Sequence, residues 1–219
     1  MPFNSDHYNK IRSEVPANVT IVAVSKTKPI SDIQEAYHFG VRDFGENYVQ
    51  ELVDKYEALP KDIRWHFIGH LQSNKVKYIA PFVELIHGVD SEKLLVEINK
   101  QGKKLNRKIN CLLQMHIAKE ETKFGMNEKE LHTVIEKLSV FDFVNVCGLM
   151  GMASFTDNKQ TIKSEFTCLS DLFQSIYKPP TTNNKPLILS MGMSSDYTIA
   201  IACGSNMIRI GSILFGKRT

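Results

Sequence analysis

The stretch IVAVSKTKPIS, residues 21–31, starts as an apolar run and then breaks into two lysines that lie two residues apart. Such a run is typical of a strand that is buried on both faces of a sheet. Lys26 and Lys28 follow it, and Pro29 comes next. The stretch therefore predicts a buried strand that ends in two amines.

Short apolar runs of this kind alternate with amphipathic segments along the rest of the chain. This alternation favours β/α units and a parallel sheet. Eight strands are predicted, at residues 19–25, 41–44, 65–68, 85–89, 109–116, 144–149, 187–190 and 207–210.

Helices are predicted between these strands. Ser31 and Gln34 form a capping-box pattern beside apolar residues at helical spacing, and Asn127 and Glu130 form another. Apolar stripes at 94–98 and 162–176 are expected to be packing faces. Eight β/α repeats in 219 residues favour one domain, residues 1–219, with a TIM-type (β/α)8 barrel fold. A doubly wound open sheet is the main alternative.

The composition excludes several classes of protein. Hydrophobic residues make up 42% of the chain and the formal net charge is +3, without a basic stripe, so no nucleic-acid partner is expected. Residues 1–20 are polar and no later run approaches a membrane span, which predicts a cytoplasmic protein without a membrane partner.

Cysteines and histidines show no metal-binding pattern. The four cysteines lie far apart without a CxxC motif and are interpreted as reduced core thiols: Cys111, Cys147, Cys168 and Cys203. Because His70, His87 and His116 also lack the spacing of metal ligands, no metal is predicted.

In a barrel of this type the chemistry takes place at the carboxyl ends of the strands, where Lys26 lies. If Lys26 points into the barrel mouth, alternation along the strand places Val22 and Val24 inside the barrel. A desolvated lysine beside a second cation, here Lys28, can act as a nucleophile towards carbonyl compounds. The alternative is that both lysines extend from the strand end into water.

The last predicted strand lies in MIRIGSILFG, residues 207–216, where Arg209 interrupts an apolar run. A buried arginine needs a partner, so we expect a ligand or a carboxylate to face it. Gly211 and Ser212 then offer backbone N–H groups and a hydroxyl, at a place where barrels commonly bind phosphate.

The preceding loop, LSMGMSSDYTIA at residues 189–200, supplies Gly192, Ser194 and Ser195 just before a predicted helix. These residues either bind an anion or form a glycine turn with a serine cap. In a closed barrel the first strand lies beside the eighth, which brings Lys26 next to this phosphate site. An amine beside a phosphate site is typical of a pyridoxal phosphate (PLP) pocket or of a Schiff-base aldolase.

Six motifs, AVSKTKP, FGENYVQE, WHFIGHLQSNK, GLM, LSMGMSSD and MIRIGSILFG, occur in order over nearly the whole chain. Together they resemble the pyridoxal phosphate homeostasis proteins. The resemblance implies a barrel of the alanine racemase type, with PLP bound covalently as a Schiff base on Lys26. It also implies that Ser194, Gly211 and Ser212 surround the cofactor phosphate and that Arg209 lies near the pyridine nitrogen. A permanently charged arginine cannot accept a proton, so the ring would be a weaker electron sink.

Some positions leave alternatives open. Ser212 stands where the family often has threonine, which keeps the hydroxyl, and GLMGMAS departs from the family pattern after Met150. Asn47 either hydrogen-bonds the cofactor ring or caps a helix. His66 either faces the pocket or is a core histidine that a carbonyl satisfies.

Two classes of function compete. A PLP-dependent amino-acid racemase needs a second acid or base, which alanine racemase-like enzymes take from a C-terminal β domain and a dimer partner. The conceivable acids in this chain are Tyr48, Tyr197 and His66. Since only a few residues follow the last predicted strand, we favour a monomeric, non-catalytic carrier with no catalytic residue, which buffers PLP or transfers it to PLP-dependent recipient enzymes. Weak racemase activity and a Schiff-base aldolase stay as alternatives.

Overall fold

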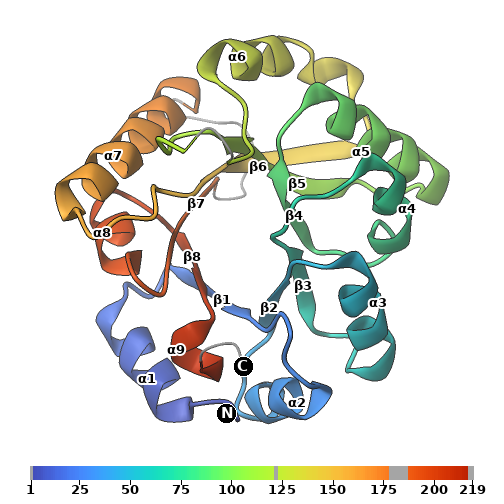
Figure 1. The fold of residues 1–219 in the computed structure, drawn as a ribbon. Coiled ribbons are helices and arrows are strands. Elements are labelled where there is room, and N and C mark those ends of the chain that lie inside the picture. The colour runs from blue at the N-terminus through green and yellow to red at the C-terminus, as the bar shows by residue number, and fades with distance from the viewer. Residues whose placement is uncertain (1, 121–122, 178–186, 217–219) are drawn as a thin grey trace.

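The structure, a computed structural model, describes residues 2–120, 123–177 and 187–216. Eight parallel strands form a closed barrel in the order β1 to β8, and helices surround it (Figure 1). The strands are β1 Thr20–Val24, β2 Asp43–Glu46, β3 Arg64–Phe67, β4 Leu85–Val89, β5 Ile109–Met115, β6 Val144–Gly151, β7 Ile188–Met193 and β8 Met207–Ile210. The predicted barrel is confirmed, and the open-sheet alternative is wrong.

Strand β1 closes the barrel against β8, in a register that runs from Thr20 opposite Met207 to Ala23 opposite Ile210. This pairing brings the segment after β1 beside the segment after β8. The predicted proximity of Lys26 to the glycine and serine that follow Arg209 therefore has a structural basis.

Three strands, β2, β6 and β7, have a boundary that differs from the predicted one by two residues or more. Strand β2 starts at Asp43 rather than at Val41, because the N–H of Val41 donates to the carbonyl of Ala36 in the turn that ends the preceding helix. Strand β7 extends beyond Ser190 to Met193. Apolar runs mark which residues are buried, whereas the hydrogen bonds between strands decide where each strand begins and ends.

Helices fill the intervals between the strands. They are α1 Ser5–Glu14, α2 Ile30–His38, α3 Val49–Ala58, α4 Val76–Ile79, α5 Glu92–Leu105, α6 Glu128–Glu136, α7 Lys159–Ile176, α8 Tyr197–Ala202 and α9 Ser212–Phe215, with short 3₁₀ turns at Ser73–Lys75 and Leu138–Val140. The capping box of Asn127 and Glu130 at the start of α6 is confirmed. The capping box predicted at Ser31 is wrong, since α2 begins at Ile30 after Pro29.

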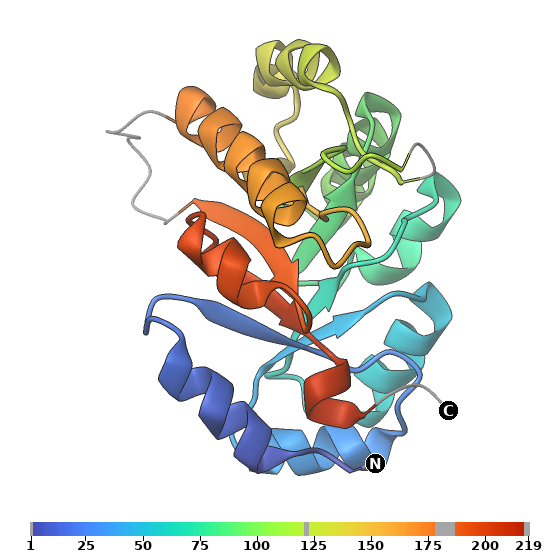
Figure 2. The same cartoon turned by 60° about the vertical axis from the view of Figure 1, so that its left-hand side comes forward.

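Helix α1 was not predicted, because its sequence is polar and only Ile11 is buried. The side chain of Asn4 caps this helix by accepting a hydrogen bond from the N–H of His7. The backbone N–H of Asn4 donates to the carbonyl of Leu214 in α9. Helices α1 and α9 therefore lie side by side outside the ring of strands (Figures 1 and 2).

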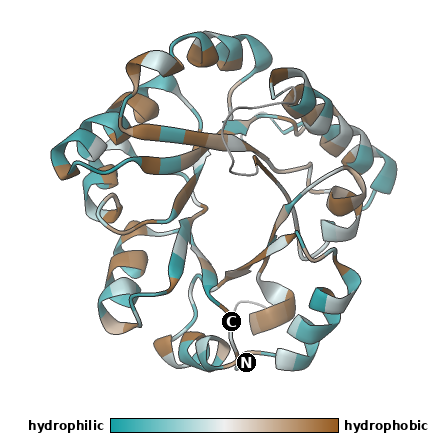
Figure 3. Ribbon diagram, turned by 180° about the vertical axis from the view of Figure 1, so that it is seen from behind, coloured by the Kyte–Doolittle hydropathy of each residue, from teal (hydrophilic) through white to brown (hydrophobic). Residues whose placement is uncertain are grey.

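The core has two parts, on the two sides of the strands. Apolar side chains between the strands and the helices form the larger part, and Ile21 and Ala23 of β1 belong to it. A smaller cluster fills the barrel interior and consists of Val22, Leu85, Leu112, Met150 and Met207. Seen from behind, hydrophobic residues follow the strands and the helix faces towards them (Figure 3). The predicted alternation along β1 is confirmed.

The remaining expectations concern thiols, metals and membranes. The prediction of core thiols is right for Cys111 and wrong for Cys168, which lies on an exposed face of α7. No group of histidine, cysteine and carboxylate side chains that suits a metal occurs within the described residues. In the same part of the chain, no helix has the length and apolar character to cross a membrane.

Candidate cofactor-binding site

A cavity of about 500 Å³ opens at the carboxyl ends of the strands, within the usual volume range of small-molecule sites. Seven of the predicted site residues line it: Lys26, Lys28, Asn47, Ser194, Arg209, Gly211 and Ser212. They come from the segments after β1, β2 and β7 and from β8 and its following turn. The structure thus brings together residues that are far apart in the sequence.

A tight turn after β1 carries the two lysines. The N–H of Lys28 donates to the carbonyl of Ser25 over 3.0 Å, and Thr27 between the lysines has a left-handed backbone with φ 64°. β-Branched residues rarely adopt this conformation. The N–H of Thr27 also donates to Oε1 of Glu51 over 2.6 Å. The turn places Lys26 and Lys28 on the wall of the same cavity.

A buried ion cluster holds this turn from below. Nζ of Lys55 donates to the carbonyl of Ser25, to Oε1 of Glu46 and to Oε1 of Glu51, at 2.8, 2.8 and 2.6 Å. The hydroxyl of Ser25 donates to the same Glu46 oxygen over 2.6 Å. Burial raises the pKa of Glu46 to about 7, although Lys55 and Ser25 oppose the rise. Sequence reasoning missed this cluster, whose members lie on three separate elements.

Arg209 is 4% exposed and points into the barrel from β8. Its Nη1 donates to the carbonyl and the hydroxyl of Ser190, at 3.0 and 2.6 Å, and its Nη2 donates to the carbonyl of Gly151 at 3.1 Å. Its hydrogen bonds within the protein thus go to carbonyl and hydroxyl oxygens, and Asp196 is the carboxylate that acts on its charge. Burial lowers the pKa of Arg209 to about 10, against the attraction of Asp196. Arg209 therefore keeps its charge at neutral pH.

The loop after β7 and the turn after β8 form a cradle of polar donors. The N–H of Gly211 donates to Oγ of Ser194 over 3.3 Å, and Asp196 fixes the loop by accepting from the N–H of Met193 over 2.6 Å. A β-carbon at position 211 would lie 3.3 Å from Cβ of Val24. Glycine therefore permits the close approach of this turn to β1. Hydroxyls and N–H groups in such a cradle suit a phosphate.

Asn47 supplies an unsatisfied acceptor. Its Oδ1 is buried, and it has no hydrogen-bond partner among the described residues. The helix-capping alternative is wrong, because Tyr48 occupies the N-cap position of α3 and Asn47 precedes it. An unpaired buried acceptor costs about 1–3 kcal/mol unless a ligand satisfies it. Together with the lysines, Arg209 and the phosphate cradle, this acceptor fits a phosphorylated aromatic aldehyde with a ring hydroxyl, such as PLP.

His66 does not line the cavity. It lies on β3 inside the barrel, where Nδ1 contacts Nε2 of His87 at 2.9 Å and Nε2 contacts Oδ1 of Asp43 at 3.2 Å. Of the two alternatives for His66, the structure shows the buried core histidine and not the one that faces the cavity. Its partners are a second histidine and a carboxylate, and no carbonyl bonds to it among the hydrogen bonds of the described residues.

The loop after β6, which the sequence left open, completes the cavity wall with Met152 and Phe155. The N–H and hydroxyl of Ser154 donate to the two carboxylate oxygens of Glu165 in α7, at 2.7 and 2.6 Å. Oγ of Ser154 also accepts from the N–H of Lys119 over 2.9 Å. These contacts between separate elements leave no local sequence signal, which explains why the loop could not be assigned.

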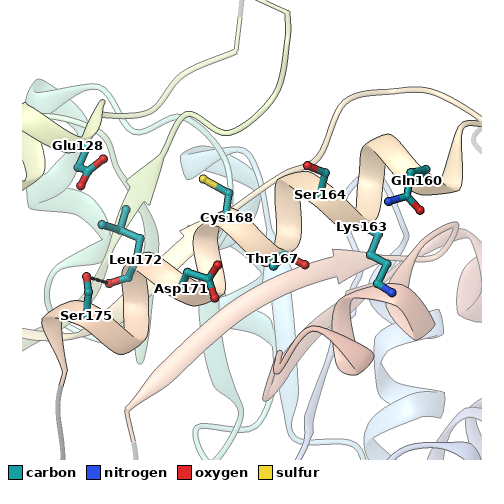
Figure 4. A pocket seen from close by; sticks show the side chains of 9 residues that line it. All are labelled: Glu128, Gln160, Lys163, Ser164, Thr167, Cys168, Asp171, Leu172 and Ser175. Atoms are coloured by element: carbon teal, nitrogen blue, oxygen red, sulfur yellow. Dashed lines mark hydrogen bonds between the residues drawn. The ribbon is translucent and has the colours of Figure 1, made fainter.

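A second hollow of about 680 Å³ lies on the outer side of the barrel along α7. Figure 4 shows that all the labelled side chains except Glu128 come from this one helix. Most are polar side chains of an exposed helix face, among them Lys163 and Asp171. This hollow lacks the converging donors and buried cation of the barrel mouth, so we assign it no function.

Comparison with known proteins agrees with this geometry. The family model described as alanine racemase, N-terminal domain, matches residues 5–219. A relative from Synechocystis sp. named pyridoxal phosphate homeostasis protein is 38% identical over 218 residues, which cover 99% of each chain. One of the same name from Schizosaccharomyces pombe is 39% identical over 92% of this chain and 85% of its own. The chain belongs to the pyridoxal phosphate homeostasis family.

Solved structures extend the comparison. The structure of PipY from Synechococcus elongatus with PLP bound has a TM-score of 0.86 and is 34% identical. The match covers 96% of the present chain and 99% of the PipY chain. Alanine racemase of Clostridium difficile has a TM-score of 0.77 at 16% identity, over 99% of this chain and 58% of the racemase. The racemase comparison shows a shared barrel fold and nothing more.

Proposed function

We propose that the protein binds PLP covalently through Lys26 and acts in PLP homeostasis as a reversible carrier. The observation that carries this proposal is the convergence of Lys26, Arg209 and the Ser194–Gly211 cradle on one cavity. The names of the curated relatives and the PLP in the PipY structure support it.

Each group on the cavity wall has a distinct role in this proposal. The amine of Lys26 condenses with the aldehyde of PLP and releases one water. Ser194, Gly211 and Ser212 bind the phosphate, and Oδ1 of Asn47 accepts a hydrogen bond from the ring hydroxyl. Arg209 faces the ring nitrogen and, because its charge is permanent at neutral pH, it leaves that nitrogen unprotonated.

The placement of the conceivable acids favours a carrier over a racemase. Tyr48, Tyr197 and His66 are absent from the cavity wall. The hydroxyl of Tyr197 instead donates to Glu14 over 2.9 Å, and His66 bonds to its neighbours inside the barrel. A racemase needs such a group within hydrogen-bond reach of the reacting carbon. Transfer to recipient enzymes, a monomeric state and a cytoplasmic location stay parts of this proposal.

The decisive experiment joins absorption spectra to peptide mass. The wild type is expected to develop a visible band with PLP, and borohydride should remove that band and fix the cofactor on the peptide that contains Lys26. Lys26→Ala should show neither effect, and Lys163→Ala, on the exposed face of α7, should behave as wild type. Absence of the band from the wild type contradicts the proposal.

A racemisation assay separates the carrier from the enzyme. Single enantiomers of amino acids are incubated with PLP-loaded protein at high protein concentration, and formation of the opposite enantiomer is measured by chiral chromatography. We expect no turnover above that of free PLP. Turnover that disappears with Lys26→Ala would show that the protein is an enzyme.

A further inference from the structure

The barrel interior below the cavity contains a continuous row of polar contacts. It starts at the cavity wall with Arg209 and ends at Asp43 on β2, and its middle members are fully or almost fully buried. The distances are 2.6 Å from Arg209 Nη1 to Ser190 Oγ, 3.3 Å from Ser190 Oγ to His87 Nδ1, 2.9 Å from His87 Nε2 to His66 Nδ1 and 3.2 Å from His66 Nε2 to Asp43 Oδ1.

The chemistry of the two end groups fixes the direction of the two end contacts. Arg209 can only donate, because a guanidinium has no acceptor. Asp43 can only accept, because it is ionised: burial alone would raise its pKa, but hydrogen bonds from Arg64 and His66 lower it to about 2. When each ring carries one proton, donors and acceptors alternate in one direction, from the cavity wall to β2.

This direction assigns the protons on both histidine rings. His66 donates from Nε2 to Asp43, so its Nδ1 accepts from Nε2 of His87. Nδ1 of His87 then accepts from the hydroxyl of Ser190, whose oxygen accepts from Arg209. In this arrangement each ring carries its one proton on Nε2. Burial, with the charges of His66 and Arg209, holds the pKa of His87 well below its usual value, which agrees with this assignment.

We propose that Ser190, His87 and His66 are positioning residues that hold the Arg209 guanidinium in the cofactor cavity, through a chain that needs both rings neutral. A further proton on either ring makes Nδ1 of His87 a donor towards Ser190, so the Ser190 hydroxyl loses its acceptor within this row of contacts. The effect on cofactor binding rests on the proposed function, whereas the proton positions do not.

Other charged groups face the chain at its ends. Asp43 also pairs with Arg64 of β3 and lies near Tyr8 of α1, and Arg209 faces Asp196 in the loop after β7. Burial raises the pKa of Asp196, so this carboxylate is a second group near the cavity that can titrate in acid. The test must therefore follow the NMR signals of His66 and His87 directly, so that their titration is distinguished from that of Asp196.

The first test uses wild-type protein without cofactor. Nitrogen-15 NMR of the imidazole rings distinguishes the two neutral tautomers from the charged ring. We expect His66 and His87 to be neutral at pH about 7.5 with the proton on Nε2. Ser190→Ala should alter the His87 signals. A charged ring, or a proton on Nδ1 of either residue, overturns the proposal.

The second test measures PLP affinity of Ser190→Ala between about pH 8 and pH 5.5. Loss of the hydroxyl is expected to weaken binding about tenfold at pH 8. Wild-type affinity should fall more steeply in acid than that of Ser190→Ala, in which the chain is already broken. Comparing the variants at each pH removes the effect of the phosphate, whose second pKa is about 6.

The matched control is Ser205→Ala. Ser205 is a buried serine beside the same strands, but its hydroxyl bonds to backbone groups of Leu189, Met191 and Met207 and lies outside the chain. This variant should lose stability and keep both the affinity and the pH profile of the wild type. Equal pH profiles for Ser190→Ala and the wild type contradict the proposal. If PLP fails to bind the wild type while NMR confirms the proton positions, the proposed function is wrong and the assigned row of hydrogen bonds from Arg209 to Asp43 is still supported.

Discussion

Nζ of Lys55 donates a hydrogen bond of 2.8 Å to the carbonyl oxygen of Ser25, the residue just before Lys26. Lys55 is buried, and the same Nζ also pairs with two carboxylates, those of Glu46 and Glu51. The backbone just before Lys26 is therefore held by a charge that lies on α3, the second helix after β1. The conformation of the cavity wall therefore depends on an ion cluster whose charged side chains do not line the cavity.

Lys55→Met should destabilise the fold and slow PLP binding, because it leaves two carboxylates without their cation. Removing one partner of a buried pair costs about 3–5 kcal/mol. We expect the free energy of unfolding, measured in urea, to fall by about 3 kcal/mol. Lys100→Met is the matched control, because its pair with Glu97 is exposed and should contribute less than about 1 kcal/mol. Equal losses for the two variants would refute the role of the cluster.

The raised pKa of Glu46 makes stability depend on pH. Its folded value of about 7 lies above its ordinary value of 4.5, so the folded state binds the proton more tightly. This contribution is fully present below pH 4.5 and is lost as the pH rises through about 7. Between pH 5 and 8 the free energy of unfolding of wild type should fall by about 2 kcal/mol more than that of Glu46→Gln. Parallel curves would disprove the shift.

Lys28→Ala should retain the covalent link and slow its formation. The positive charge of Lys28 beside the same cavity disfavours the protonated form of the Lys26 amine, which is the unreactive one. We expect capture of PLP at neutral pH to slow about fivefold in stopped-flow absorbance, and we expect Lys28→Arg to restore the rate. Loss of the borohydride-fixed link in Lys28→Ala would instead assign the covalent role to Lys28.

Ser212→Ala should weaken binding of PLP about tenfold, since a hydrogen bond to a charged phosphate contributes about 1.5–3 kcal/mol. Ser212→Thr keeps the hydroxyl and should bind as wild type. Pyridoxal, which lacks the phosphate, provides the internal control, and its affinity should be the same for all three proteins. A similar loss for pyridoxal would place Ser212 away from the phosphate.

Periodicity and motif order were enough to predict the barrel and the contents of its mouth. Barrel closure makes neighbours of the two strands that end in AVSKTKP and MIRIGS. The sequence alone therefore predicts that Lys26 and Arg209 lie close together. Alternation also placed Val22 inside the barrel. These inferences need only the side of the strand on which a residue lies.

The two alternatives that the sequence left open for His66 show where such reasoning ends. Alternation along β3 correctly turns its ring inward, but the height of a residue in the barrel depends on the stagger between strands, which no local pattern encodes. His66 therefore lies below the cavity and meets His87 from β4. The contacts of Lys55 with Glu46 and of Glu165 with Ser154 escaped prediction because each depends on how a helix packs against the strand or loop before it, which no residue pattern encodes.

Thr27 has a further consequence for how the protein captures its ligand. A left-handed conformation costs an ordinary residue about 1–2 kcal/mol, and glycine would avoid that cost. Glycine would also allow the segment between Lys26 and Lys28 to sample many conformations before a ligand arrives. With threonine held by Glu51, the entropy of ordering this turn is lost once, when the chain folds. Each arriving ligand then meets a lysine backbone that is already in place.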